Sequence, residues 1–202
     1  MSNIKKVFKF LFVRGYLKGD YMKLVNRFLA IAVAGILAPM AANAASTVTF
    51  QGEVSAQTCK ASIAGGTNGI VLLPTVAAKD LQNAGTTAGL TKFTINVTDC
   101  TDPGSSDLPI KTKFLGHAVT GNGNLGNMAA ANPAGNVAIQ LTSDGVGTAP
   151  ITLNGPTSVA GLKLLAGQTS ASYDFGARYI SENGGATPGP VTSVVEYTLS
   201  YQ

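Results

Sequence analysis

The sequence predicts an all-β protein, a sandwich or barrel of short strands. The first observation is that glycine occurs 21 times in residues 45–202, about 13% of that segment, against a usual ~7%. Together with Pro, Asn and Thr, these glycines divide the chain into pieces too short for long helices. The second observation is that the pieces between them are β-branched or alternate polar with apolar residues, which is typical of sandwich and barrel strands.

Eight of these pieces are predicted strands: residues 47–54, 69–73, 90–98, 108–115, 136–142, 151–153, 172–180 and 191–201. Residues 128–131 are the best helical candidate, and four residues are too few to matter. The chain shows no internal repeat and no linker between two domains. We therefore expect one domain after residue 44, where 158 residues offer ample material for a single hydrophobic core.

Residues 22–44 have the three parts of an export signal peptide. Residues 22–27 are positively charged, residues 28–40 are apolar, and a small-x-small motif ends at Ala44. We predict cleavage between Ala44 and Ala45. The apolar stretch of 13 residues is shorter than the ~20 that a membrane span needs. The mature chain is therefore expected to be exported and to carry no membrane span.

Residues 1–21 do not belong to an ordinary leader. Met22 begins a complete one, so the sequence favours Met22 as the true start and residues 1–21 as an upstream extension, with Met1 as the alternative. N-terminal sequencing of the precursor and the mature chain decides between the two. A mature chain that begins before residue 40 would contradict the predicted cleavage.

The distribution of charge argues against a nucleic-acid partner. The whole chain has a formal charge of +4, which at first suggests nucleic acid or a membrane surface. Seven of its 14 Lys and Arg residues, however, lie in the first 27 residues, where Asp20 is the only acid. From Ala45 onward seven bases stand against nine acids, a net charge of −2. A basic surface for nucleic acid is therefore not expected.

Cys59 and Cys100 are the only cysteines, and both follow the leader. Two cysteines in a chain exported to an oxidising compartment are normally bridged. Closing a loop of this length stabilises the fold by roughly 4 kcal/mol in the chain-entropy model. We predict a disulfide, with two free buried thiols as the alternative.

The two ends of the mature chain alternate more cleanly than the rest. Residues 46–54 place one apolar row on a single face of a strand, made of Val48, Phe50, Gly52 and Val54. Residues 195–202 do the same with Val195, Tyr197, Leu199 and Tyr201. Chain ends fray unless they are tied down. An apolar row this close to the new N-terminus is therefore expected to dock on something.

Candidate catalytic and ligand sites are weak. His117 is the only histidine, so a second imidazole for a metal site is missing. Residues 121–126 match the dinucleotide-binding pattern GxGxxG, but Pro133 follows too soon for the helix that this pattern requires, which favours a surface loop. Residues 96–98 match a glycosylation motif inside a predicted strand and are interpreted as sheet. No enzyme activity, metal or cofactor is expected.

An ordered set of motifs resembles a known family, the major fimbrial subunits (type 1 pilin-like) of chaperone-usher pili. The resemblance spans nearly all of the mature chain. No single motif is decisive, but their order is specific. The motifs are the leader, the alternating run 47–54 before Cys59, the block 94–100, Phe114-Leu115-Gly116, the block 175–179, Gly189 fourteenth from the end and the penultimate Tyr201.

The resemblance implies an immunoglobulin-like sandwich that lacks its last strand and is completed by a donor strand from a neighbouring subunit. Residues 45–57 would be the donor extension and residues 58–202 the pilin domain. The implied donor residues are Val48, Phe50, Gly52 and Val54. The implied edge for a periplasmic chaperone comprises Val195, Tyr197, Leu199, Tyr201 and Gln202.

The resemblance also implies the partners and the location of the mature chain. An outer-membrane usher would exchange the chaperone for a donor strand of an identical or related pilin subunit. The product would be a fimbrial rod outside the cell that supports adhesion. The mature N-terminus is short ahead of Thr47, which leaves the donor register open.

Three alternatives stay open. The chain could be a minor adaptor subunit, which would share every feature used so far. It could be a tip adhesin or another carbohydrate-binding module, although a two-domain adhesin needs a longer chain and this one lacks Trp for sugar stacking. Finally, both terminal runs could be ordinary core strands of one closed sandwich, which alternation by itself does not distinguish.

Overall fold

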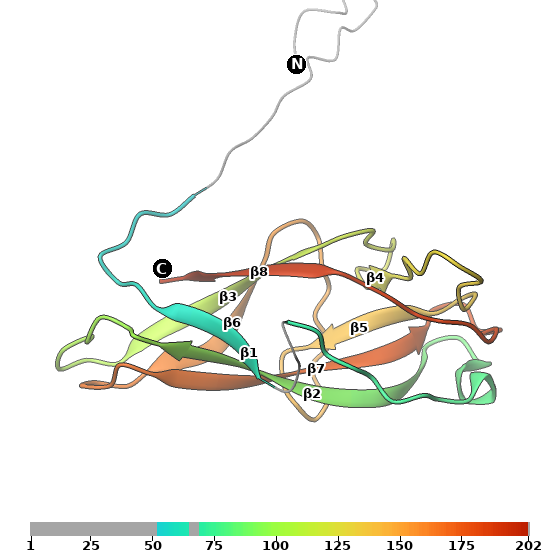
Figure 1. The fold of residues 1–202 in the computed structure, drawn as a ribbon, viewed down its shortest axis with the longest axis horizontal. Helices are drawn as coiled ribbons and strands as arrows, with labels where there is room; N and C mark the ends of the chain where they lie inside the picture. Colours follow the sequence, from blue (N-terminus) through green and yellow to red (C-terminus); the bar gives the residue numbers. More distant parts are fainter. Residues whose placement is uncertain (1–51, 65–68, 202) are drawn as a thin grey trace, which may run out of the picture. The chain divides into compact units, whose positions relative to one another are not determined.

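Two antiparallel sheets pack face to face in a computed structural model that describes residues 52–64 and 69–201 (Figure 1). The strands are β1 (Lys60–Ala64), β2 (Thr86–Thr98), β3 (Leu108–Gly116), β4 (Leu125–Gly126), β5 (Ala138–Thr142), β6 (Thr157–Leu164), β7 (Ala171–Ser181) and β8 (Val195–Ser200). One sheet has the order β1-β2-β7-β5-β4, and the other has the order β6-β3-β8. The predicted all-β sandwich is confirmed.

Alternation in the central strands builds the core. In β2, Phe93, Ile95 and Val97 are buried, and the residues between them are more exposed. Phe93 lies opposite Phe175 of β7, and their rings stack with centroids 5.7 Å apart. Phe114 of β3 meets Phe175 edge-on at 5.2 Å. Because β3 belongs to the other sheet, these aromatic contacts join the two layers.

Three strands were missed because their local patterns are weak. β1 has one β-branched apolar residue, β4 has two residues, and β6 contains Gly161, which has a φ of +137°. The β3–β6 register shifts opposite this glycine. A Cβ at Gly161 would meet the ring of Tyr173, so glycine is required there for close packing rather than for a turn.

Two strand predictions are wrong, and the short helical candidate is not a helix. Residues 69–73 form no regular strand, although Val71 and Leu73 pack on the core. Residues 151–153 form no continuous ladder, since Ile151 and Leu153 donate their N–H groups to two different segments. Both side chains are buried, and Thr152 between them is exposed. Residues 128–131 are not helical, and the described helix is a single 3-10 turn at Ala78–Leu81.

The predicted disulfide between Cys59 and Cys100 is present. It links the residue before β1 to the chain just after β2, next to the first paired residues of these strands, Lys60 and Thr98. The bridge therefore fastens the short edge strand β1 to the central part of its sheet.

The remaining sequence motifs have structural roles. Residues 96–98 lie in β2, as predicted, and residues 121–124 form a loop that leads into β4. His117 contacts Glu196 at the surface, with 2.9 Å between Nε2 and Oε1. Within residues 52–64 and 69–201, the structure contains no helix long and apolar enough to span a membrane.

Candidate assembly groove

β1 is one edge strand of the larger sheet, and β8 is one edge strand of the smaller sheet. Among the described strands β1 pairs only with β2, and β8 pairs only with β3. The two edges face each other across a groove, because Cys59 and Ala61 line one wall while Tyr197 and Leu199 line the other. A two-layer sandwich that lacks a strand at its margin has this geometry.

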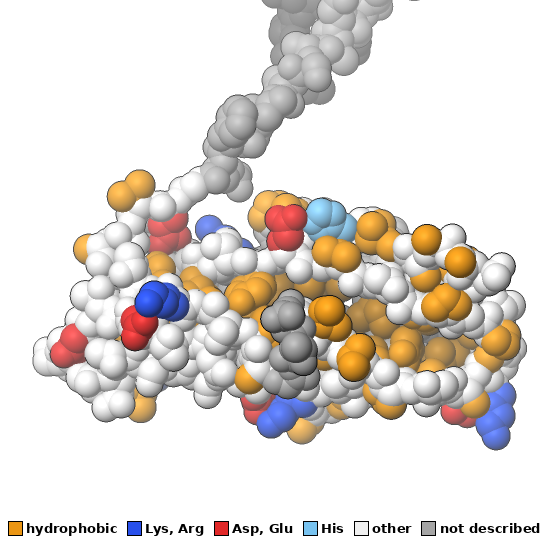
Figure 2. Space-filling model, viewed as in Figure 1, with side chains coloured by type: hydrophobic (Ala, Val, Ile, Leu, Met, Phe, Trp, Pro, Cys, Tyr) orange, Lys and Arg blue, Asp and Glu red, His pale blue; other side chains and the backbone are white. Residues whose placement is uncertain are grey.

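The groove consists of two consecutive hollows along the same pair of edges. The larger has a volume of ≈ 890 Å³ and lies against Ile63 and Val195. The smaller has a volume of ≈ 710 Å³ and continues toward Tyr201. Tyr197 lines both hollows. Figure 2 shows hydrophobic side chains gathered in a hollowed strip along this face.

Core side chains form the floor of the larger hollow. Phe93, Phe114, Leu125, Ile139 and Leu141 line it, and each is buried within the chain. The same residues belong to the main hydrophobic cluster of the described chain. The groove thus opens directly onto the hydrophobic core, and a strand laid into it would extend that core.

The predicted edge residues come together on the groove side of β8. Val195, Tyr197, Leu199 and Tyr201 are all half-buried and pack against the core clusters. Glu196 and Thr198, which alternate with them, are exposed. Burial raises the pKa of the Tyr197 phenol above its ordinary value. Gln202, the fifth predicted residue, lies outside the described residues.

The backbone of β8 presents unused hydrogen-bonding groups to the groove. Val194 accepts a hydrogen bond from the His117 N–H on the β3 side. Backbone groups of successive residues in a strand point to opposite edges. The N–H and C=O groups of Val195, Tyr197 and Leu199 therefore point to the open edge, where a further strand could pair with them.

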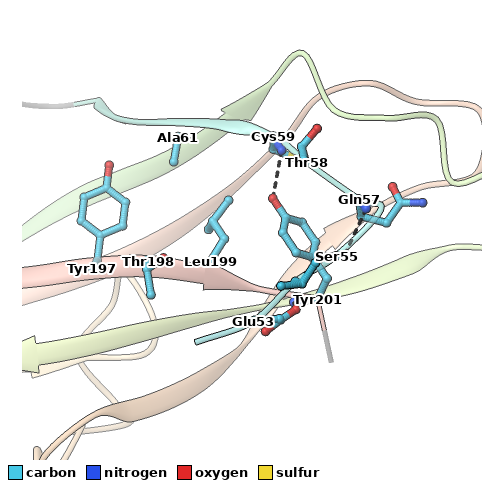
Figure 3. Close-up of a pocket in the computed structure, with 11 residues that line it drawn as sticks. Glu53, Ser55, Gln57, Thr58, Cys59, Ala61, Tyr197, Thr198, Leu199 and Tyr201 are labelled. Atoms are coloured by element: carbon cyan, nitrogen blue, oxygen red, sulfur yellow. Dashed lines mark hydrogen bonds between the residues drawn. The ribbon is translucent and has the colours of Figure 1, made fainter. Parts of the chain in front are cut away.

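The Tyr201 end of the groove is bridged. The Cys59 N–H donates to the Tyr201 hydroxyl across the groove, with 2.9 Å between N and O (Figure 3). The Glu53 carboxylate accepts hydrogen bonds from the Ser200 hydroxyl at 2.7 Å and from the Tyr201 N–H at 2.9 Å. Sequence reasoning missed this role of Glu53, because alternation alone placed it on the polar side of a predicted strand.

The N-terminal apolar row is only partly described. Val48 and Phe50 lie outside the described residues, as does the cleavage site at Ala44 and Ala45. Residues 52–54 form no strand here, and Val54 is fully exposed. Docking of this row on another subunit stays a prediction.

Comparison with known proteins points to one family. Residues 48–202 match the family model described as fimbrial protein. The major fimbrial subunit SMF-1 of Stenotrophomonas maltophilia is 41% identical over 174 residues, covering 81% of this chain and 97% of that protein. The F17 fimbrial protein of Escherichia coli is 35% identical over 179 residues, covering 84% of this chain and 97% of that protein.

The fold agrees as well. The crystal structure of the P pilus rod subunit PapA superposes with a TM-score of 0.51 at 17% identity, covering 71% of this chain and 99% of that chain. At this identity the likeness concerns the fold alone, an immunoglobulin-like sandwich. A family model that spans most of the sequence, two relatives matched over nearly their whole lengths and a sandwich open along one margin lead to one conclusion: the chain belongs to the fimbrial protein family.

Proposed function

We propose that this fimbrial subunit polymerises by donor-strand exchange, as the major subunit of a fimbrial rod that supports adhesion. In each step, residues 46–54 of one copy fill the groove between β1 and β8 of the next. The observation that carries the proposal is that the groove opens onto the core and presents the unpaired backbone of β8. The role is structural rather than enzymatic, and its place is the extracellular fimbrium.

The energy of such a joint comes from both side chains and backbone. The proposed donor face comprises Val48, Phe50, Gly52 and Val54. Burial of each of its large apolar side chains contributes about 1.5–3 kcal/mol, and each backbone hydrogen bond to β8 adds roughly 0.5–1.5 kcal/mol. Gly52 suits a place in the groove that tolerates no side-chain volume. The sum favours a durable joint between subunits.

An open groove is also a hazard for a single subunit. Exposed strand edges pair with other chains and lead to aggregation, and here two edge strands border a groove that opens onto the core. We propose that a periplasmic chaperone covers the edge formed by Val195, Tyr197, Leu199, Tyr201 and Gln202 until assembly. An outer-membrane usher would then exchange the chaperone for the donor strand. The relative that is 41% identical is a major fimbrial subunit, which supports the major over the minor role.

Deletion of residues 45–54 tests the proposal. When co-expressed with a cognate chaperone and usher, the deletion variant should fold and bind the chaperone but form no fibres in electron micrographs. Addition of a peptide with the sequence of residues 46–54 should protect the groove-facing amides of Val195, Tyr197 and Leu199 from hydrogen exchange. Fibres formed by the deletion variant, or loss of its fold, would contradict donor-strand exchange. Short tips in place of long rods would point to a minor subunit.

A further inference from the structure

The Glu53 carboxylate lies at the C-terminal end of the open edge of β8. It accepts hydrogen bonds from the Tyr201 N–H and the Ser200 hydroxyl. These bonds, with Lys113 and Lys111 of β3 nearby, hold the pKa of Glu53 below its ordinary value of 4.5. The side chain is therefore an anion at neutral pH and a strong acceptor.

The Tyr201 N–H is one of the backbone N–H groups that point to the groove edge. Val195, Tyr197, Leu199 and Tyr201 alternate with the residues that bond β3, so their backbone groups point to the same edge. The row thus offers its N–H groups at every second residue. The last of these groups is already bonded by the Glu53 carboxylate, which stands where a partner strand would place a carbonyl oxygen.

We propose that Glu53 is a stop for the strand that fills the groove. An incoming strand pairs with Val195, Tyr197 and Leu199 and ends before Tyr201, because Glu53 holds the Tyr201 N–H. The entry of a strand into the groove rests on the proposed function. The contact of Glu53 with Tyr201 does not depend on it.

The contact between Glu53 and Tyr201 also limits which residues of the subunit's own donor segment can reach a neighbour. Because Glu53 is bonded to its own β8, the chain is free to reach a neighbour only from Gly52 backward. Val54, one residue after the anchored Glu53, is then outside the joint. The donor face proposed above narrows to Val48, Phe50 and Gly52.

Hydrogen exchange of the isotopically labelled chain tests the contact. Relative to the parent, Glu53→Ala should exchange the Tyr201 amide about tenfold faster, and Glu53→Gln, which keeps an acceptor oxygen, should lie between the two. Glu196→Ala is the matched control, since Glu196 is a carboxylate on β8 that contacts His117. The buried Ile95 amide in β2 reports whether each variant is folded. Equal Tyr201 exchange in the parent and in folded Glu53→Ala would overturn the proposal.

A peptide with the sequence of residues 46–52, which lacks Glu53, tests the stop. In the parent chain this peptide should protect the amides of Val195, Tyr197 and Leu199 and leave Tyr201 exchange unchanged. In Glu53→Ala the protection should extend to Tyr201. Displacement of Glu53 by the peptide in the parent, seen as a change at Tyr201, would contradict a stop. Absence of protection at all four residues would overturn the proposed function and the stop together, while the Tyr201 exchange of the free chain would still report the contact.

Assembly gives an independent measurement. A charged side chain on the buried donor face should prevent assembly, so Phe50→Asp should form no fibres. Val54→Asp should form fibres in similar amount to the parent, because Val54 lies outside the joint. Loss of fibres in Val54→Asp, with normal folding and chaperone binding, would overturn the narrowed donor face.

Discussion

The centre of the molecule and its open margin are built from the same kind of strand but differ in what covers them. β2 and β7 have neighbours on both sides, and their central apolar residues, such as Phe93 and Phe175, are buried. β8 alternates just as cleanly, yet Tyr197 and Leu199 stay half-buried, because no described strand pairs with its outer edge. The difference shows that alternation predicts a buried face but not which chain buries it.

The largest effect on stability should come from the closed region. Phe175→Ala removes a side chain that is 1% exposed and contacts the rings of Phe93, Phe114 and Tyr173. The free energy of unfolding should fall by about 3–5 kcal/mol, measured by denaturant titration of the single chain. A loss below about 1 kcal/mol would mean that the centre is no better packed than the margin.

Removal of the disulfide should have the next largest effect, because the disulfide ties the margin to the centre. The Cys59→Ser/Cys100→Ser variant should lose about 2–4 kcal/mol of unfolding free energy. Relative to the parent, hydrogen exchange should accelerate more in the amides of β1 than in those of β7, since β1 has only one neighbouring strand among those described. Uniformly faster exchange in both strands would show that the bridge stabilises the whole fold rather than this edge.

Tyr197→Ala should separate stability from assembly. Because its side chain is half-buried at the groove, the single chain should stay within about 1 kcal/mol of the parent in unfolding free energy. Fibre formation should nevertheless be strongly reduced, since Tyr197 lines both hollows of the groove. Thr198→Ala, on the exposed face of the same strand, is the control and should assemble normally.

The smallest effect should be local and depend on pH. Hydrogen bonds from the Thr148 hydroxyl and from backbone N–H groups of the loop lower the pKa of Asp144 below its ordinary 3.8. A lowered pKa in the folded state stabilises the loop above pH 3.8, and this contribution is lost as the pH falls through the lower folded value. Hydrogen exchange of the Val146 and Thr148 amides, corrected for intrinsic rates, should therefore accelerate as the pH falls through this range.

The matched control for this prediction is Asp144→Asn, which does not titrate in this range. Its loop amides should show no such acceleration between neutral pH and pH 3. An equal acceleration in the variant and the parent would show that Asp144 is not the group responsible.

Much of the sandwich was predictable from local pattern. β2, β3, β5, β7 and β8 coincide with predicted strands, apart from their bounds, because each alternates or is β-branched over five residues or more. β6 was missed because Gly161 interrupts its pattern, and this glycine is needed for a contact with Tyr173 that only the folded chain reveals. Residues 151–153 misled for the opposite reason, since Ile151 and Leu153 are apolar and buried but bond two separate segments.

By itself, the sequence determined the fold class, the disulfide partners and the members of the β8 face, since each depends on composition, cysteine count or a period of two. The tertiary structure alone decided that β1 and β8 face each other as unpaired edges and that the groove between them opens onto the core. It also decided that Glu53 reaches Tyr201, 148 residues away in sequence. These features depend on which distant segments meet, and a local pattern contains no information about that.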